Sequence, residues 1–290
     1  MEKTNLYSKV IAGTMTWGSW GKQLSTNQMA DLINYCLEIG ISTFDHADIY
    51  GDYENETAFG KAFVESKVDR SKIQLISKCG IQMTRGRDNI VKHYQYDADY
   101  IIWSAEQTLK KLKTDYLDLF LLHRPSPLMV PDEIAEAILK LTEAGKIKEF
   151  GVSNFTPSQI AMLETKLPVS ANQVEFSLTH TEPVYDGTFD DCISKNRMAM
   201  AWSPLGGFFR EENEQQSRIA TLIKELQEKY DADTSQLLLA FIMNHPVGIY
   251  PVVGTATKAR LEESLKASEI KLDLQDWFLL LEASHGESVP

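Results

Sequence analysis

Short apolar runs alternate with longer amphipathic segments along the chain. Eight of the apolar runs are continuous, which is typical of strands buried on both faces of a parallel sheet. These predicted strands span residues 10–12, 41–45, 73–77, 117–122, 149–152, 171–175, 199–202 and 249–253. The segments between them have helical spacing and span residues 26–39, 54–66, 98–112, 131–144, 157–166, 184–194, 215–230 and 258–267.

Local signals support several of these helices. Ser25 can cap the helix that begins at residue 26, and Gly40 and Gly145 stand where helices are expected to stop. Pro131 and Pro157 stand in the first turn of two others. Two more helical patterns, at residues 234–244 and 274–282, are interpreted as additions to the repeating pattern.

Eight alternations of strand and helix predict a closed α/β structure, the (β/α)8 or TIM barrel. The alternative is an open doubly wound sheet, but no G-x-G-x-x-G follows the first strand. No linker-like or low-complexity stretch divides the sequence, so we expect a single domain over residues 1–290 with extra C-terminal helices.

Composition narrows the class of protein. The chain has 290 residues, 43% of them hydrophobic, and a net charge of −12, which argues against non-specific nucleic-acid binding. Its three cysteines are too few and too scattered for a disulfide framework or a zinc cluster, and no His/Cys/carboxylate set predicts a metal site. No signal-peptide pattern or long apolar run is present, so we expect a cytoplasmic protein without membrane attachment.

Polar side chains follow three consecutive predicted strands. Asp45 ends the second strand, Lys78 follows the third, His123 follows the fourth, and Tyr50 lies five residues beyond Asp45. Barrel enzymes carry their chemistry at these strand ends, and neighbouring strands are about 4.8 Å apart. We therefore expect the four side chains to converge in one pocket.

The residue types indicate acid catalysis. A lysine at an apolar strand end needs a counter-ion, which Asp45 can supply, and the ammonium group would lower the pKa of Tyr50. Tyr50 could then protonate a carbonyl oxygen that His123 orients. Each residue alone also has an ordinary structural interpretation: Asp45 as a loop cap, Lys78 as a snorkelling side chain and His123 as a partner of a backbone carbonyl.

The later strand ends have features of a dinucleotide site. Ser153, Asn154 and Gln173 offer polar groups, Trp202 offers a ring, and the loop that follows it, 203–207, contains two glycines. A helix start with cations follows the eighth strand, at residues 254–260. Ordinary turn chemistry is the alternative for these loops, and Trp202 could also be a core residue.

With these motifs in place, the chain resembles the aldo-keto reductases from about residue 13 to about residue 265. The resemblance is carried by residues 13–18 (GTMTWG), 44–51 (FDHADIYG), 77–78 (SK), 115–123 (DYLDLFLLH) and 151–155 (GVSNF). By this resemblance the catalytic tetrad is Asp45, Tyr50, Lys78 and His123. The resemblance implies cofactor contacts at Gly13, Thr14, Ser153, Asn154, Gln173, Trp202, Ser203, Leu205, Gly207, Gly254, Thr255, Lys258, Arg260 and Glu263.

Three positions depart from the family pattern: His46, where Ser or Thr is commoner, Gly254, where Lys is common, and Ser264, where Asn is common. The last two concern the adenosine 2′-phosphate, so NADPH is the expected cofactor and NADH an alternative.

The expected activity is NADPH-dependent reduction of a small-molecule aldehyde or ketone to an alcohol, with Tyr50 as proton donor. Met15, Trp17 and Trp20 are expected either to line the substrate site or to pack beneath their loop. One alternative function is a barrel aldolase or lyase with Lys78 as a Schiff-base nucleophile. Another is a non-catalytic regulatory subunit that binds NADP(H). We expect a monomer or a weak homo-oligomer.

Overall fold

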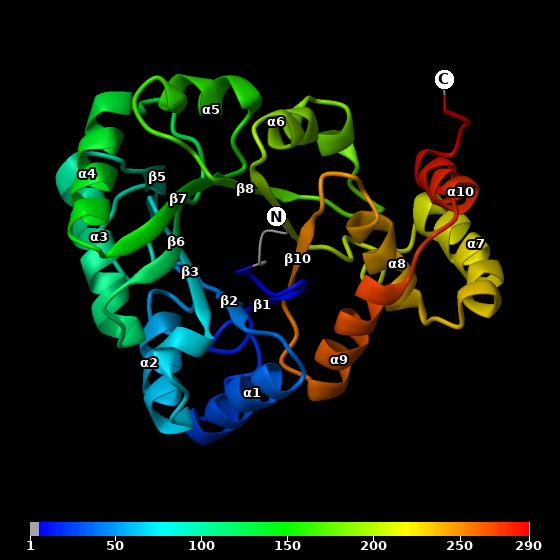
Figure 1. Cartoon of the computed structure of the whole chain (residues 1–290), viewed down its shortest axis with the longest axis horizontal. Helices are drawn as coiled ribbons and strands as arrows, with labels where there is room; N and C mark the ends of the chain where they lie inside the picture. The colour runs from blue at the N-terminus through cyan, green and yellow to red at the C-terminus, as the bar shows by residue number, and fades with distance from the viewer. Residues whose placement is uncertain (1–5, 290) are drawn as a thin grey trace.

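Eight parallel strands close into a barrel in the computed structural model, which describes residues 6–289 (Figure 1). Around the barrel the strands follow the order β1, β10, β9, β8, β7, β6, β3, β2. Their bounds are β1 Ile11–Gly13, β2 Thr43–Asp45, β3 Gln74–Cys79, β6 Leu117–Leu122, β7 Ile147–Ser153, β8 Ala171–Glu175, β9 Met198–Trp202 and β10 Tyr250–Val253. The predicted barrel is confirmed, and each predicted strand overlaps an observed one.

Helices surround this barrel (Figure 1). They are α1 Thr26–Glu38, α2 Asn55–Ser66, α3 Ala98–Leu112, α4 Pro131–Glu143, α5 Pro157–Glu164, α6 Thr188–Ser194, α7 Glu214–Tyr230, α8 Thr234–Met243, α9 Lys258–Lys266 and α10 Leu274–His285. The start of α1 is capped as predicted, because the Ser25 hydroxyl accepts a bond from the Gln28 N–H and the Gln28 side chain bonds back to the Ser25 N–H. The pattern at 184–194 is only half helical, since Gly187 adopts a φ of +85° before α6 begins.

Buried residues form two layers. Alternate strand residues point into the barrel, where Ile11, Ile76, Leu119, Leu121 and Met200 form a compact apolar cluster. The other strand residues face outward and join the helices in a larger core. Because the strands are covered on both sides, most of their residues are apolar, as in the β6 sequence LDLFLL.

One interpretation of the helices is wrong. The sequence pattern favours residues 215–230 as a barrel helix and 234–244 as an addition, but the roles are reversed. Helix α8 is buried along residues 236–242 and contacts β10, whereas α7 pairs with α10 at one side of the barrel (Figure 1). The reason is composition: α8 is apolar around most of its surface, so it is stable only when covered on several sides.

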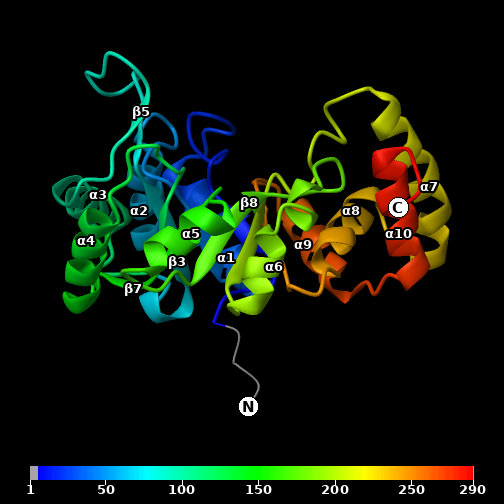
Figure 2. The same cartoon turned by 90° about the horizontal axis from the view of Figure 1, so that it is seen from above.

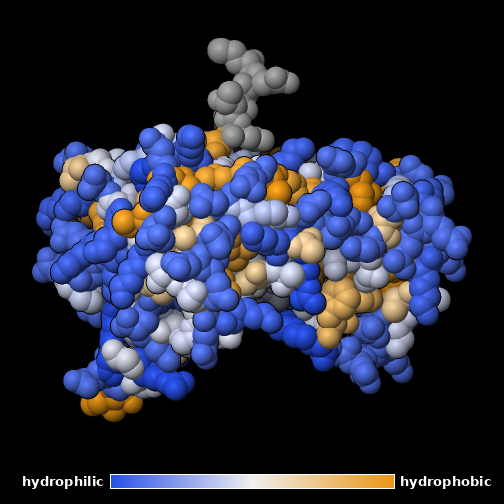
Figure 3. Space-filling view, turned by 90° about the horizontal axis from the view of Figure 1, so that it is seen from below, coloured by the Kyte–Doolittle hydropathy of each residue, from blue (hydrophilic) through white to orange (hydrophobic). Residues whose placement is uncertain are grey.

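The loops at the carboxyl ends of the strands are long on one side of the molecule. Figure 2 shows the segment that contains strand β5 and the segment that leads into α7 projecting on the side opposite the N-terminus. Strands β4 Ile81–Gln82 and β5 His93–Tyr94 form an antiparallel hairpin, which the sequence pattern did not predict. Figure 3 shows a mainly hydrophilic surface with a hollow between two projecting segments.

Candidate active site

Asp45, Tyr50 and Lys78 form one bonded group, as the strand-end argument predicts. The Lys78 Nζ lies 2.7 Å from each carboxylate oxygen of Asp45, 2.7 Å from the His46 carbonyl oxygen and 3.4 Å from the Tyr50 hydroxyl. Lys78 is completely buried. A buried ammonium is stable only when it is paired and hydrogen-bonded, and these four contacts meet that condition.

The pKa of Tyr50 differs from expectation. Burial raises it and outweighs the opposing effect of the Lys78 ammonium, so the net shift is upward, and the expected net lowering is wrong. Lys78 acts in the expected direction, but desolvation of the phenolate is the larger effect. Tyr50 is therefore a protonated phenol at neutral pH, with a cation in place to stabilise the tyrosinate formed when it gives up its proton.

His123 completes the group. Its ring lies edge-on to Tyr50 with the centroids 6.1 Å apart. Burial lowers its pKa well below the usual value, and the charges of Lys78, Arg124 and Lys92 act in the same direction. Its Nδ1 has no hydrogen-bond partner among residues 6–289. The imidazole is neutral and has one N–H with which to orient a substrate oxygen.

A row of polar side chains continues from β7 to β9. The Gln173 amide donates to Asp45 over 2.9 Å, and the Ser153 hydroxyl donates to the Gln173 carbonyl over 2.8 Å. Asn154 bonds Ser153 and accepts from the Trp202 indole N–H, both over 2.8 Å. This network links Trp202 to Asp45 through hydrogen bonds.

Two adjoining cavities run along the carboxyl ends of the strands. The first, of about 600 Å³, has Asp45, Tyr50 and His123 in its wall. The second, of about 730 Å³, lies between the loops that follow β9 and β10. They share four wall residues: Ser203, Pro204, Arg210 and Gly254. Together they form one extended site.

Most of the residues predicted for cofactor and substrate binding lie in these walls. The first cavity contains Gly13, Met15, Trp20, Ser153, Asn154, Gln173, Trp202, Ser203 and Gly254. The second contains Ser203, Leu205, Gly254, Thr255, Arg260 and Glu263. Backbone geometry is unusual at this edge, because Asn154 and Ser203 have positive φ values of 63° and 51°. Such strain concentrates at functional sites.

Four predicted contacts are not in the walls, each for a physical reason. Trp17 is completely buried against Phe44, so it packs beneath its loop and does not line the substrate site. Thr14 is also buried and donates to the Asp45 carbonyl. The Gly207 N–H is already bonded to the Thr179 hydroxyl, over 3.0 Å.

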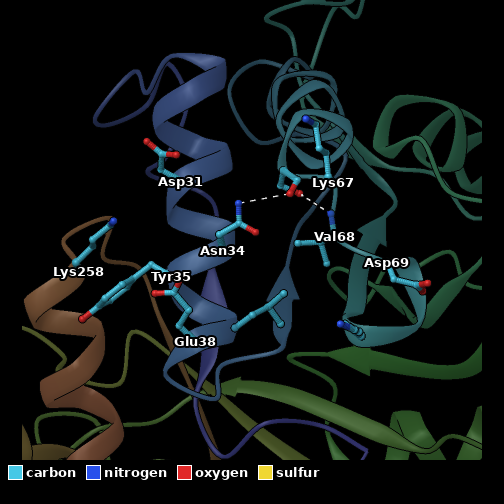
Figure 4. Close-up of a pocket in the computed structure, with 11 residues that line it drawn as sticks. Asp31, Asn34, Tyr35, Glu38, Lys67, Val68, Asp69 and Lys258 are labelled. Atoms are coloured by element: carbon cyan, nitrogen blue, oxygen red, sulfur yellow. Dashed lines mark hydrogen bonds between the residues drawn. The ribbon is translucent and has the colours of Figure 1, made fainter.

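Lys258 is the fourth. It turns toward α1, where its Nζ lies 4.9 Å from the centroid of the Tyr35 ring, at the edge of a separate groove of about 840 Å³ (Figure 4). Figure 4 shows Asp31, Glu38 and Lys67 on the same groove, which runs between α1 and the end of α2. The Lys258 side chain therefore lies away from the second cavity in this structure.

Sequence reasoning missed several cations of the site. Lys92 and Arg124 line the first cavity, Lys22 lines the second, and Arg210 lines both. Lys92 directly precedes strand β5, which belongs to the hairpin that the sequence pattern did not predict. No motif places Lys22 or Arg210 at a strand end, so only the folding of their loops shows their position.

Two further properties describe the chain outside this site. No helix within residues 6–289 has the length and apolar character needed to cross a bilayer. The same residues contain no group of three or more His, Cys, Asp or Glu side chains arranged to hold a metal ion.

Comparison with known proteins agrees with this geometry. The model of the Aldo/keto reductase family matches residues 9–284. The chain is 39% identical to Oxidoreductase YdhF of Escherichia coli (98% of this chain, 96% of the relative). It is 33% identical to 6-dehydroglucose reductase of Agrobacterium fabrum over the full length of both. The thermostable aldo-keto reductase Tm1743, solved with the inhibitor epalrestat, superposes with a TM-score of 0.81 at 26% identity (95% of this chain, 94% of that chain). The chain therefore belongs to the aldo/keto reductase family and is an oxidoreductase.

Proposed function

We propose that this oxidoreductase reduces an aldehyde or ketone to an alcohol with NADPH, and that Tyr50 donates the proton. The observation that carries the proposal is the contact of a protonated, partly buried phenol with a buried ammonium group at the wall of a cavity. Acid catalysis needs a proton donor whose conjugate base is stabilised in place. Tyr50 and Lys78 satisfy both needs.

The residues of the two cavities fit a nicotinamide dinucleotide. The first cavity offers the amide groups of Asn154 and Gln173 and the ring of Trp202. The second offers Lys22 and Arg260, and Arg210 stands where the two cavities join. Space is available at the junction, because a Cβ added to Gly254 would meet no atom within 4 Å. Amides and a ring at one end, with cations at the other, match the two halves of such a cofactor.

The chain's own residues account for proton transfer and orientation. NADPH, when bound, supplies the hydride that reduces the carbonyl carbon. The neutral imidazole of His123 offers an N–H to the carbonyl oxygen, and the Tyr50 hydroxyl donates its proton to that oxygen. The resulting tyrosinate is stabilised by Lys78, whose charge is balanced by Asp45.

A Schiff-base role for Lys78 is disfavoured by its contacts. Burial would lower the pKa of Lys78, but the charges of Asp45 and Tyr50 outweigh that effect and raise it. A nucleophilic amine must lose its proton first. The same contacts that serve Tyr50 therefore oppose covalent catalysis by Lys78.

The preference for NADPH over NADH is proposed from the second cavity. Lys22 and Arg260 line it, and both are free of ion pairs within residues 6–289. An additional phosphate group would gain charge-assisted contacts there, which NADH cannot make. Fluorescence titration should therefore give a lower Kd for NADPH than for NADH. Equal Kd values would overturn the preference without affecting the proposed chemistry.

The test of the function is Tyr50→Phe, which removes only the hydroxyl. NADPH titration should give a Kd within about twofold of wild type, whereas NADPH oxidation with a panel of carbonyl compounds should slow by about 10²–10⁴-fold, the usual contribution of a positioned acid. Tyr116→Phe is the matched control, because Tyr116 contacts Arg70 and Lys148 and lies outside both cavities.

Three outcomes would count against the proposal. Turnover of Tyr50→Phe close to wild type would remove Tyr50 as the proton donor. Tight NADPH binding by the wild type without oxidation by any carbonyl compound would favour a regulatory subunit. Absence of binding of either nucleotide would overturn the cofactor assignment.

A further inference from the structure

The first cavity has an excess of positive charge beside the catalytic group. Four cationic side chains line it or stand directly behind it, namely Lys78, Lys92, Arg124 and Arg210, against the two carboxylates Asp45 and Glu175. Lys78 and Asp45 neutralise each other. In a chain with a net charge of −12, the remaining cations in this wall are a local reversal of sign.

Lys92 and Arg124 have no anionic partner within residues 6–289, because no carboxylate lies within 4.0 Å of either cationic group. Glu175 shares the cavity with them but forms no such pair. Arg70, by contrast, bonds the Asp118 carboxylate over 2.7 Å. Unpaired cations at a cavity wall are thus available to a ligand.

One hydroxyl group, that of Tyr96, bonds both backbone polar groups of Arg124. The Tyr96 hydroxyl donates to the Arg124 carbonyl over 2.6 Å and accepts from the Arg124 N–H over 3.2 Å. Tyr96 itself packs over Gly80, where a Cβ would stand 2.1 Å from the ring. The guanidinium lies 5.3 Å from the centroid of the Trp202 ring. Arg124 is therefore positioned before any ligand arrives.

Lys92 approaches from a different element. It directly precedes strand β5, which pairs with β4 in register Gln82 to His93. The loop of that hairpin is fixed by Tyr53, whose hydroxyl accepts from the Met83 N–H over 2.8 Å. The charges of Lys92 and Arg124 both act on His123, and that of Arg124 also acts on Tyr50. Both cations line the same cavity wall as Tyr50 and His123.

These cations are not needed for the phosphates of the cofactor. The phosphate-binding end is expected in the second cavity, which Lys22, Arg210 and Arg260 line, and neither Lys92 nor Arg124 belongs to that wall. Their position in the first cavity places them within reach of the part of a substrate that extends beyond its carbonyl group.

We propose that the carbonyl substrate carries an oxyanion, either a carboxylate or a phosphate, and that Arg124 and Lys92 bind it. The planar guanidinium of Arg124 pairs with two oxygens of such a group, and the ammonium of Lys92 adds a point charge from the hairpin. This inference rests on the proposed carbonyl reduction and specifies its substrate class.

The test compares aldehydes that carry an anionic group with neutral counterparts. One pair is 4-formylbenzoate and its methyl ester, and the other is glyceraldehyde 3-phosphate and glyceraldehyde, so the two pairs also distinguish carboxylate from phosphate. For wild type, kcat/KM with at least one anionic aldehyde should exceed that with its neutral partner by about 10- to 100-fold, mostly through KM, because a hydrogen bond to a charged group is worth that much.

Two variants assign the effect to the named residues. Arg124→Met should remove at least about tenfold of the anionic preference, and Lys92→Met, whose side chain is exposed, a smaller part. Both should lower kcat/KM for the anionic aldehydes more than for their neutral partners, and both should keep the Kd for NADPH within about twofold. Lys92→Glu, at an exposed position, should reduce the anionic preference further than Lys92→Met does. Arg85→Met is the control, a cation of the same hairpin loop that pairs with Asp52 outside the cavity.

Several results would overturn the assignment. Equal kcat/KM values for charged and neutral aldehydes would do so, as would variants that lose activity toward both alike or that weaken NADPH binding. If no aldehyde is reduced, carbonyl reduction itself fails, and equilibrium binding decides the subsite. In that case, binding of 4-formylbenzoate but not its ester to the NADPH-saturated protein supports the anion subsite, and equal binding refutes it.

Discussion

Replacing Lys78 by Met tests the electrostatic argument on which the site depends. Methionine fills the same completely buried space without a charge or a donor. The substitution removes the two 2.7 Å contacts with Asp45 and leaves that carboxylate with the 2.9 Å bond from Gln173 as its remaining side-chain donor. Breaking a buried ion pair on one side costs about 3–5 kcal/mol. The free energy of unfolding should fall by that amount at pH 8.

The loss should depend on pH and on Asp45. In the variant, the folded state gains stability when Asp45 takes up a proton, whereas an exposed aspartate in the unfolded chain does so only near a pKa of about 3.9. Stability of the variant relative to wild type therefore falls as the pH rises, and the deficit should be smaller at pH 5 than at pH 8. Adding Asp45→Asn should restore about 2 kcal/mol or more at pH 8, because it removes the unpaired charge.

Guanidinium-induced unfolding, followed by far-UV circular dichroism at both pH values, measures these differences. Lys148→Met is the matched control. Lys148 also pairs with a buried aspartate, Asp118, but it is half exposed and Arg70 holds the same carboxylate. Its loss should cost at most about 1 kcal/mol. A loss below about 1 kcal/mol for Lys78→Met at both pH values, or no recovery in the double variant, would refute the argument.

Two further predictions concern stability. Burial lowers the pKa of His46 to about 3, so below pH 6.5 the unfolded chain binds a proton that the folded chain does not. The free energy of unfolding of His46→Asn should therefore rise relative to that of wild type by about 1.4 kcal/mol per pH unit as the pH falls from 6.5 to 4. Burial raises the pKa of Asp48 to about 7, so this group stabilises the folded state as the pH falls and masks the effect of His46 in wild type. The unfolding free energy of His46→Asn is therefore compared with that of wild type at each pH, with the exposed His93→Asn as control. If the two plots of unfolding free energy against pH run parallel, the prediction for His46 is contradicted. Gly60→Ala should lower the free energy of unfolding, measured by chemical denaturation, by about 3 kcal/mol, because its Cβ would stand 1.9 Å from a carbonyl oxygen of α3. Gly145→Ala, in open space at a φ of +68°, should lower it by only about 1 kcal/mol. Equal losses in the two variants would refute the packing argument.

The barrel and the candidate catalytic group follow from local sequence features. A strand covered on both faces must be a continuous apolar run, and eight such runs are visible without any knowledge of the packing. The carboxyl ends of parallel strands lie at one edge, so Asp45, Lys78 and His123 come together once the strands pair. The spacing of apolar residues and the places where the strands end can be read from the sequence, and they suffice to predict that these three side chains lie together.

Other features depend on contacts between distant segments. The sequence does not show which way the side chains of Trp17 and Lys258 point. In the structure Trp17 packs against Phe44, and Lys258 lies over the ring of Tyr35. The pKa of Tyr50 depends on a balance of burial against one neighbouring charge, and only the structure shows that burial is larger. The convergence of Lys92 and Arg124 likewise depends on a hairpin that folds over the barrel. Sequence determines where the strands end, whereas the tertiary structure determines the direction, burial and electrostatic surroundings of each side chain, because these arise from residues far apart in the chain.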